Sequence, residues 1–382
     1  MASSSRADFG LLISVIRDLN RDPLFQVAVC EVGTHISRHS ENFQSLRDAG
    51  VTKLSLFIDA PLGDTPDCKA QFVTSIVTSL TSYFSTSATD AIFILGDRYE
   101  TLAIAYAASL SNIPIIHLVG GDLTHGSIDD NYRHAITKLA RVHFVTNIDS
   151  YSRVLQLGEE SEFVYVSGSP GLDDVNNFDF VSQESLEETL GIKFKKNLIL
   201  VTFHPDSINP SEIENQVTEL TKALEQFLLD STIILTGANY DSGYITINEM
   251  LKIFAVKHPN SVKFIENLGT RKYLSLMKIA SIMVGNSSSG YYEAPSFSLP
   301  VVDLGNRQKG RIAHELLTNV PIESEHIVIG MNLSMNQDRV KILNPYGDGK
   351  SSVKIREFLK TLPLGKLKSP KNFVNLPPKG LN

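Results

Sequence analysis

The sequence predicts an α/β protein made of two doubly wound, Rossmann-like domains. Short β-branched runs alternate with amphipathic helical segments along the chain, and several of these runs are apolar throughout. A continuously apolar run is typical of a parallel strand that is buried on both faces. The length of 382 residues also favours two domains over one. We therefore expect two α/β domains that face each other across a cleft.

The pattern predicts the following elements in order. In the first half we expect strands at 25–30, 53–58, 91–95, 113–118, 142–146 and 163–166, with helices at 10–19, 69–84, 100–110, 131–139 and 150–157. In the second half we expect strands at 198–203, 232–236, 262–265, 282–284 and 301–304, with helices at 212–229 and 271–279. The polar stretch 168–184 indicates a hinge. The predicted division is an N-terminal domain at 1–172, a C-terminal domain at 173–362 and a solvated or loosely docked Lys- and Pro-rich tail at 363–382.

The start of the chain departs from this rhythm. A Rossmann-like domain usually opens with a buried strand, whereas residues 3–8 already have the composition of the first loop. We therefore expect the first strand to be missing, as from a truncated start. Its loss would leave backbone groups of neighbouring strands without partners.

Composition excludes several classes of protein. The net charge of -7, without a Lys/Arg-rich stripe, argues against a nucleic-acid partner. Cys30 and Cys68 are too few for a disulfide framework or a cysteine-based metal site. The longest apolar runs fall short of the roughly 20 residues that a membrane helix needs, and the N-terminus lacks the apolar region of a secretion signal. We expect a cytoplasmic protein with no membrane partner, no metal and no cofactor.

Acidic residues follow two consecutive predicted strands. Asp97 comes directly after the strand at 91–95, and Asp122 follows the Gly pair that ends the next strand. Asp129 and Asp130 then precede a helix that contains Arg133. The carboxyl ends of parallel strands share one edge of a sheet, where open α/β folds bind ligands. Asp97, or one of the pair at 129 and 130, could instead be only a helix N-cap.

The second half carries a different set of polar residues. His204 ends the strand at 198–203, as either a structural or a functional histidine. The segment 285–290 follows another strand and opens a helix, which suits an anion such as a diphosphate, although a Ser-rich N-cap would look the same. Glu293 lies one turn later and could bind ribose hydroxyls. Arg307 belongs to three cations after the strand at 301–304, suited to the charge of a leaving group.

Taken in order, these segments resemble one enzyme family. The matching stretches are SSRADFGLL, GTHIS, LGDRYE, GGDLTHGSIDDNYRHAITK, VTFHP, GNSSSGYYEAPSF and GNRQKGR. They resemble the hydrolysing UDP-N-acetylglucosamine 2-epimerases of sialic acid synthesis and their relatives that act on diacetamido UDP-sugars. The resemblance runs from about residue 5 to about residue 310 and implies the glycosyltransferase-B fold, with the nucleotide mainly on the C-terminal domain. Homo-oligomers are expected by analogy.

The resemblance also implies roles for individual residues. The catalytic candidates are Asp97, Asp122, Asp129, Asp130 and His204. The residues implied for UDP-sugar binding are Arg6, His35, Arg98, Arg133, Asn239, Ser287, Ser288, Ser289, Glu293 and Arg307. The chain departs from the family pattern where Asp122 replaces a usual Glu, where His125 replaces another Glu, and at Val119.

The implied reaction needs several carboxylates and no metal. UDP leaves C1 while a base removes the C2 proton, and water then adds to the resulting 2-acetamidoglucal with C2 inverted. Neighbouring acids can hold different protonation states, which suits a shared set of proton transfers by Asp97, Asp122 and Asp129. Two alternatives stay open: a glycosyltransferase of the same fold, and a UDP-sugar-binding homologue with impaired catalysis. The form of the segment 128–138 disfavours a non-hydrolysing epimerase.

Overall fold

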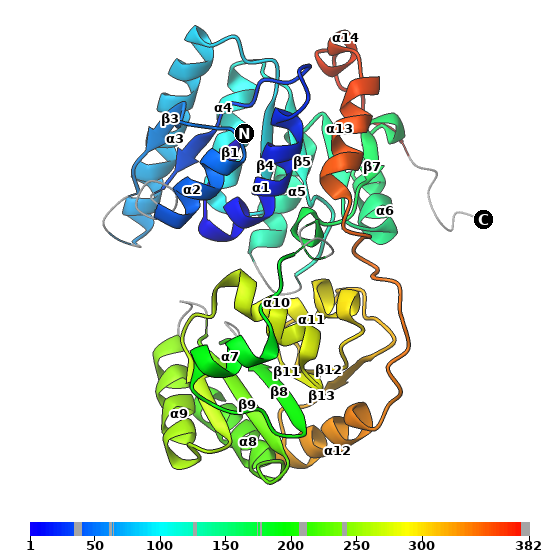
Figure 1. Cartoon of the computed structure of the whole chain (residues 1–382). Coiled ribbons are helices and arrows are strands. Elements are labelled where there is room, and N and C mark those ends of the chain that lie inside the picture. The colour runs from blue at the N-terminus through cyan, green and yellow to red at the C-terminus, as the bar shows by residue number, and fades with distance from the viewer. Residues whose placement is uncertain are drawn as a thin grey trace, which may run out of the picture. The chain divides into compact units, whose positions relative to one another are not determined.

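The computed structural model describes residues 1–33, 40–60, 63, 65–124, 128–173, 175, 178–205, 212–238 and 243–375, without the side chains of residues 6, 7, 40 and 41. The chain forms two compact units, shown in Figure 1. Unit 1 comprises Met1–Leu123, Ser127–Asp174 and Tyr346–Asn382, and unit 2 comprises Thr124–Gly126 and Val175–Pro345. Residues 346–362, predicted in the C-terminal domain, thus belong to unit 1.

Unit 1 is built on parallel strands. The strands β3 (Leu56–Ile58), β2 (Cys30–Val32) and β1 (Ala2–Ser3) pair in that order. A second group pairs as β4 (Ile92–Leu95), β5 (Ile115–Leu118), β6 (Val142–Val145) and β7 (Val164–Val166). Because β1 packs beside β4, the spatial order is 3-2-1-4-5-6-7, which is the doubly wound arrangement.

Two predictions for this sheet were wrong. The first strand is present rather than missing, since Ala2 pairs with Cys30 and Ser3 with Glu31 in parallel register. The second strand begins at Cys30 instead of covering 25–30. Its centre is Glu31, which is fully buried, so a charged residue interrupts the apolar run that would have marked the strand.

Helices cover both faces of the unit 1 sheet. One face packs against α1 (Arg6–Asn20), α2 (Ser40–Asp48), α13 (Ser351–Thr361) and α14 (Leu364–Leu367). The other packs against α3 (Pro66–Thr86), α4 (Tyr99–Leu110) and α5 (Asp129–Leu139), and α6 (Ile148–Gln156) lies on β6 and β7. Successive residues of β4 alternate between the two cores, as the strand period requires.

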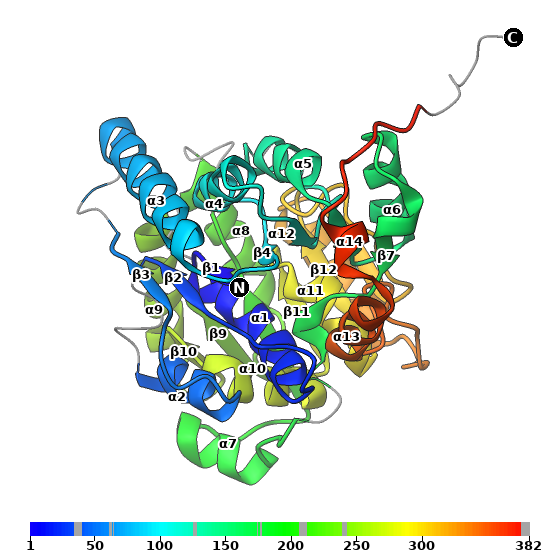
Figure 2. The same ribbon diagram turned by 90° about the horizontal axis from the view of Figure 1, so that it is seen from above.

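The end of the chain is docked on unit 1, which explains its place there. The ring of Phe358 in α13 meets those of Phe144 and Tyr165, with centroids 5.5 and 5.0 Å apart. In Figures 1 and 2, α13 and α14 lie beside β7 and α6. Beyond them, residues 368–375, here called the C-terminal strap, continue along the unit: the amide of Val374 donates to the Gly158 carbonyl at 2.9 Å. The described part of the tail is therefore not loosely docked, contrary to the prediction.

Unit 2 repeats the same architecture with one six-stranded parallel sheet. Its strands lie in the order β10 (Val262–Ile265), β9 (Ser231–Thr236), β8 (Asn197–Thr202), β11 (Ile282–Gly285), β12 (Val301–Leu304) and β13 (Leu317–Val320). Its helices are α7 (Gln183–Leu190), α8 (Ile213–Glu225), α9 (Tyr244–Lys257), α10 (Gly269–Ile279), α11 (Ser289–Tyr292) and α12 (Ser324–Met335). Helices α8, α9 and α12 enclose the main apolar core with one face of the sheet.

Across the described ranges, no helix is both long and apolar enough to span a bilayer.

Candidate active site

The centre of the site in unit 1 is the buried guanidinium of Arg133, which is 4% exposed. One nitrogen donates to Asp97 at the end of β4, and the other to Asp130, three residues earlier on α5. That second nitrogen also donates to the Asp122 carbonyl at 2.7 Å. Burial lowers the pKa of Arg133, but the charges of Asp97, Asp130 and Asp122 outweigh it and raise the pKa above its ordinary value. A permanent cation thus holds two carboxylates from different elements together.

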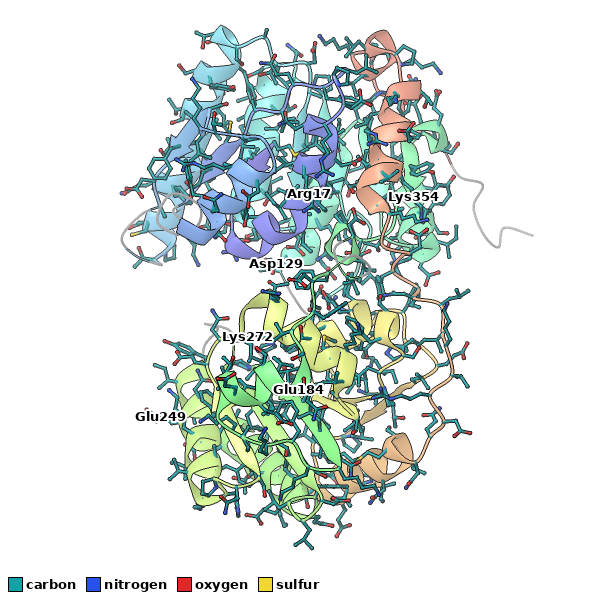
Figure 3. The ribbon with its side chains drawn as sticks, in the orientation of Figure 1. Arg17, Asp129, Glu184, Glu249, Lys272 and Lys354 are labelled. Carbon is teal, nitrogen blue, oxygen red and sulfur yellow. The ribbon has the colours of Figure 1, made fainter. Side chains whose placement is uncertain are left out.

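Access differs among these carboxylates. The side chain of Asp97 is 28% exposed and that of Asp130 is 16% exposed, so both reach the surface of the unit. Asp129 opens α5 at the same edge of the sheet, where Figure 3 labels it, and its charge acts on Arg98. Asp97, Asp129 and Asp130 therefore lie where the sequence predicted them, at the carboxyl edge of the unit 1 sheet.

Asp122 turns inward instead. It is 7% exposed, and one carboxylate oxygen accepts two hydrogen bonds of 2.6 Å, from the hydroxyls of Thr146 and Ser150. Both donors lie where β6 leads into α6. Beside it, Arg153 donates to the Gly121 carbonyl at 2.9 Å. The Asp122 side chain, one methylene shorter than the usual Glu, is thus part of the contact between the end of β5 and α6.

A buried histidine connects the two segments that carry the acids. His117 in β5 is fully buried, with Nε2 3.0 Å from the Gly96 carbonyl and Nδ1 3.2 Å from the hydroxyl of Thr137, one turn after Arg133 in α5. Burial lowers the pKa of His117 to about 3, so its ring is neutral at physiological pH. A Cβ at Gly120 would lie 2.9 Å from His117 Nδ1, which explains the first Gly of the pair.

Arg98, predicted to bind the UDP-sugar, forms a fork with Glu100: Nε and Nη2 each donate to one carboxylate oxygen at 3.2 Å. Its side chain is 50% exposed while that of Glu100 is 7% exposed. Burial lowers the pKa of Arg98, but Glu100, Asp8 and Asp129 outweigh this and raise it. The Arg98 guanidinium is therefore a fixed positive charge at the same sheet edge as Asp97.

In unit 2, the amide side chain of Asn286 fixes the strand end that carries His204. Its Oδ1 accepts from the His204 N–H at 2.7 Å, and its Nδ2 donates to the His204 carbonyl at 2.9 Å. Burial, and secondarily the charge of Arg307, lower the pKa of His204 to about 3. His204 is therefore a neutral side chain rather than a cation.

The serine loop is only partly as predicted. Helix α11 does follow Ser287 and Ser288, but it is a single turn and gives way to a 3-10 turn, η4 (Ala294–Phe297), at Pro295. The N–H of Ser289 bonds to the Ser287 hydroxyl at 3.3 Å and that of Gly290 to the Ser287 carbonyl at 3.2 Å. These two amides are therefore engaged by hydrogen bonds inside the loop.

Two side chains that the sequence did not single out, Tyr273 and Asn286, also lie at this edge. Tyr273 of α10 lies 3.2 Å from the Thr202 hydroxyl, and burial raises its pKa despite hydrogen bonds that include Ser289 and Ser287. Burial also raises the pKa of Glu293. Tyr273 had no motif around it, whereas Asn286 stood within a motif that was noted only for its serines.

The predicted ligands that remain are Arg307, His35, Asn239 and Arg6. Arg307 donates to the Asn286 carbonyl at 3.2 Å, which places a cation after β12 as predicted. His35 and Asn239, predicted to bind the UDP-sugar, lie outside the described residues, as does the side chain of Arg6. Among the His, Cys, Asp and Glu side chains that are described, no three are gathered as a metal site.

A family model described as UDP-N-acetylglucosamine 2-epimerase matches residues 17–360. The chain belongs to this family. It is an α/β enzyme of the UDP-sugar 2-epimerases, and the predicted family and the predicted class of two α/β domains with parallel, doubly wound sheets are confirmed.

Curated relatives narrow the comparison within the epimerase family. The chain is 36% identical over 82% of its length, and 81% of the relative's, to GDP/UDP-N,N'-diacetylbacillosamine 2-epimerase (hydrolyzing) of Campylobacter jejuni. It is 31% identical to UDP-N,N'-diacetylbacillosamine 2-epimerase (hydrolyzing) of Legionella pneumophila, over 95% of both chains. A solved structure of UDP-GlcNAc 2-epimerase from Neisseria meningitidis bound to UDP-GlcNAc has a TM-score of 0.79 at 21% identity, covering 94% of this chain and 99% of the other.

Proposed function

We propose that the chain is a hydrolysing 2-epimerase of a nucleotide-linked 2-acetamido sugar, with UDP-N,N'-diacetylbacillosamine as its first candidate substrate and UDP-N-acetylglucosamine as the second. The observation that carries the proposal is the buried Arg133, which holds Asp97 and Asp130 at one sheet edge. Carboxylates fixed close together and partly accessible are suited to successive proton transfers.

The reaction divides into an elimination and an addition. In the first step a carboxylate takes the C2 proton, the C1–C2 double bond forms, and the C1–O bond breaks so that UDP leaves with the electron pair. In the second step water adds its oxygen to C1 and gives one proton to a carboxylate, while a carboxylic acid delivers a proton to C2 on the face opposite to the one from which the first proton was taken. We assign these transfers to Asp97, Asp129 and Asp130, and we assign to Asp122, held by Thr146 and Ser150, the task of fixing the loop after β5.

We assign the nucleotide to the carboxyl edge of the unit 2 sheet. The hydroxyls of Ser287, Ser288 and Ser289 and the cation of Arg307 can stabilise a diphosphate as its charge develops. Because His204 is neutral at physiological pH, it can serve there as a hydrogen-bonding group and not as a counter-charge. Glu293, half-buried one turn beyond, is suited to the ribose hydroxyls.

Sequence identity supports the order of the two candidate substrates. The two relatives named for diacetylbacillosamine are 36% and 31% identical to this chain, whereas UDP-N-acetylglucosamine 2-epimerase of Neisseria meningitidis is 27% identical over 94% of this chain. Both sugars carry the acetamido group at the carbon that is inverted, so the same proton transfers serve either one.

The test is to incubate the protein with each UDP-sugar, and with the GDP form of the diacetamido sugar, in deuterated water and to follow proton and phosphorus NMR. We expect release of the nucleoside diphosphate together with a free 2-epimer deuterated at C2. A glucal that accumulates would show elimination without efficient water addition. Turnover only when an acceptor sugar is supplied would favour the glycosyltransferase alternative, and binding of UDP without release from any sugar would favour a non-catalytic homologue. A cytoplasmic location, a homo-oligomeric state and a place in sialic or legionaminic acid synthesis stay predictions.

A further inference from the structure

A further buried acid, Asp8, lies at the sheet edge of unit 1 that carries Asp97. Asp8 belongs to the first turn of α1 and is 8% exposed. Its Oδ2 accepts from the Ser4 hydroxyl at 2.7 Å, and that hydroxyl lies 3.2 Å from the Thr101 hydroxyl of α4. Asp8 thus connects the loop between β1 and α1 to the helix that follows Asp97.

Asp8 also lies directly against the turn that carries Asp97. Gly96 has φ +93°, and a Cβ built on it would lie 3.4 Å from Asp8 Oδ1. The charged groups that act on Asp8 from this turn are Arg98, which attracts its anion, and Asp97, which repels it. Asp97 therefore has Arg133 as a hydrogen-bonded cation and Asp8 as a neighbouring anion.

Helix capping alone does not explain this arrangement. Ser5 is the N-cap of α1, and its hydroxyl accepts from the Asp8 N–H at 3.1 Å. An acid in a first turn normally stays in water, where it interacts favourably with the helix dipole. Asp8 is instead removed from water, and burial raises its pKa to about 6 even though the Ser4 and Ser5 hydroxyls oppose the rise.

The direction of this shift makes the Asp8 charge a cost to stability. A carboxyl whose pKa is higher in the folded state than the ordinary 3.8 is most favourable to folding when protonated, and its contribution falls as the pH rises through about 6. At neutral pH the folded unit therefore carries a buried anion that reduces its stability. Such groups are typical of functional sites, where activity and stability make opposite demands.

We propose that Asp8 is a positioning residue of the epimerase reaction, whose carboxylate holds the Ser4–Ser5 loop against the Gly96–Arg98 turn and thereby fixes Asp97 and Arg98 for proton transfer. The proposal rests on the proposed function. Asp8 acts through these neighbours, since its carboxylate accepts from the Ser4 hydroxyl, which itself contacts Thr101, and lies beside Gly96.

The test compares Asp8→Asn with Asp67→Asn. Asparagine keeps the size of the side chain and an oxygen that can accept from Ser4, but it removes the charge. Asp67 is an exposed first-turn acid of α3, whose N-cap Thr65 accepts from the Cys68 N–H as Ser5 does from Asp8. For both variants and the wild type we would measure kcat and KM for sugar-nucleotide hydrolysis from pH 5 to pH 9, and the Tm by circular dichroism at pH 5 and pH 8.

We expect Asp8→Asn to lower kcat by roughly 10-fold or more at pH 8, with less than a threefold change in KM, because misplacement of catalytic groups acts on the chemical step. Its Tm at pH 8 should equal or exceed that of the wild type. We expect wild-type activity to fall on acidification through about pH 6, as Asp8 becomes protonated, and we expect this fall to be weaker in Asp8→Asn. Asp67→Asn should match the wild type in all three measurements.

Two results would overturn this inference while leaving the proposed function intact. One is wild-type kcat and an unchanged pH profile in Asp8→Asn. The other is a fall in Tm and in folded fraction that accounts for the whole loss of kcat, which would make Asp8 structural only. If the wild type itself releases no nucleotide from any of the tested sugars, the proposed function fails and this inference fails with it.

Discussion

The two units share one architecture, but unit 1 satisfies the polar groups at its sheet edge chiefly with ion pairs and unit 2 chiefly with neutral hydrogen bonds. In both, a parallel doubly wound sheet presents polar side chains at its carboxyl edge. In unit 1 these are charges: Arg133 binds Asp97 and Asp130. In unit 2 they are chiefly neutral groups, with the Asn286 amide on the His204 backbone and Tyr273 on the Thr202 hydroxyl.

This difference between the two sheet edges indicates which chemical task each one is suited to. Fixed charges can move protons and hold anionic intermediates, but removal of one partner leaves an uncompensated buried charge. Neutral donors and acceptors position a ligand with less dependence on pH, and the loss of one costs only its hydrogen bonds. Substitutions at each edge test this contrast.

Replacement of Arg133 should have the largest effect. Arg133→Met keeps the approximate length of the side chain but removes the donor that Asp97, Asp130 and the Asp122 carbonyl share. We expect unit 1 to lose about 3–5 kcal/mol of stability and hydrolysis to slow on the order of 10³-fold. Urea unfolding followed by circular dichroism measures the first quantity, since the chain has no tryptophan, and nucleotide release measures the second.

Arg133→Lys is the matched control, because it keeps the charge and loses the planar fork that spans two acids. Its stability should fall less than that of Arg133→Met, while its activity should stay low. Equal stability of Arg133→Met and the wild type would show that the carboxylates do not depend on this cation, and the contrast between the units would fail.

Lys371 tests a second charged contact of unit 1, at the C-terminal strap. Its ammonium lies 2.6 Å from Glu159 and also donates to the carbonyls of Lys138 at 2.6 Å and Ala140 at 2.8 Å, at the end of α5. Glu159 is 2% exposed and binds His143 as well, at 3.1 Å. We expect Lys371→Met to lower the free energy of unfolding by about 2–3 kcal/mol.

The control for this prediction is Lys368→Met in the same strap. Lys368 pairs with Asp90 at 2.9 Å, but both side chains are more than half exposed. Its replacement should change the urea midpoint by no more than the equivalent of about 0.5 kcal/mol. Similar effects of the two variants would mean that the strap is not anchored through Lys371.

Asn286 tests the neutral edge of unit 2. Asn286→Ala removes two hydrogen bonds to the His204 backbone, and we expect a loss of about 2 kcal/mol. UDP affinity should fall with it, because the His204 segment and the loop that begins at Asn286 lose their shared support; calorimetric titration with UDP measures this. Asn286→Asp keeps an acceptor for the His204 N–H but places a buried anion against the His204 carbonyl, so its affinity for UDP should fall below that of Asn286→Ala. An affinity unchanged in both variants would contradict the assignment of the nucleotide to this edge.

Two of the buried histidines, His117 and His204, should give the smallest effect. The pKa values of His117 and His204 are lowered to about 3. When the pH falls below the ordinary value of 6.5, the unfolded chain takes up protons that the folded chain does not, so stability decreases. Between pH 7 and pH 6 each histidine should contribute less than about 1 kcal/mol of this decrease. Urea midpoints at the two pH values should therefore differ less in His117→Gln or His204→Gln than in the wild type.

The elements that the sequence predicted best are those with strong local signals. Strand β4 is an uninterrupted apolar run, and a turn with glycine separates it from helix α4. Asp97 could therefore be placed at a strand end in advance. Strand β2 was misplaced because fully buried Glu31 lies at its centre. Helix α9 was not predicted, and its exposed Ile245 and Val256 blur the helical period.

The sequence by itself determined the family, the repeated α/β rhythm and which residues stand at strand ends, because these depend on neighbouring residues and on motif order. The differences in burial and pairing among the acids became visible only in the folded chain. Folding turned Asp122 inward onto Thr146 and Ser150, buried Asp8 beside Gly96, and anchored Lys371 on Glu159. Burial and charge pairing depend on residues that are distant along the chain. No local sequence pattern therefore indicates which of several carboxylates becomes buried.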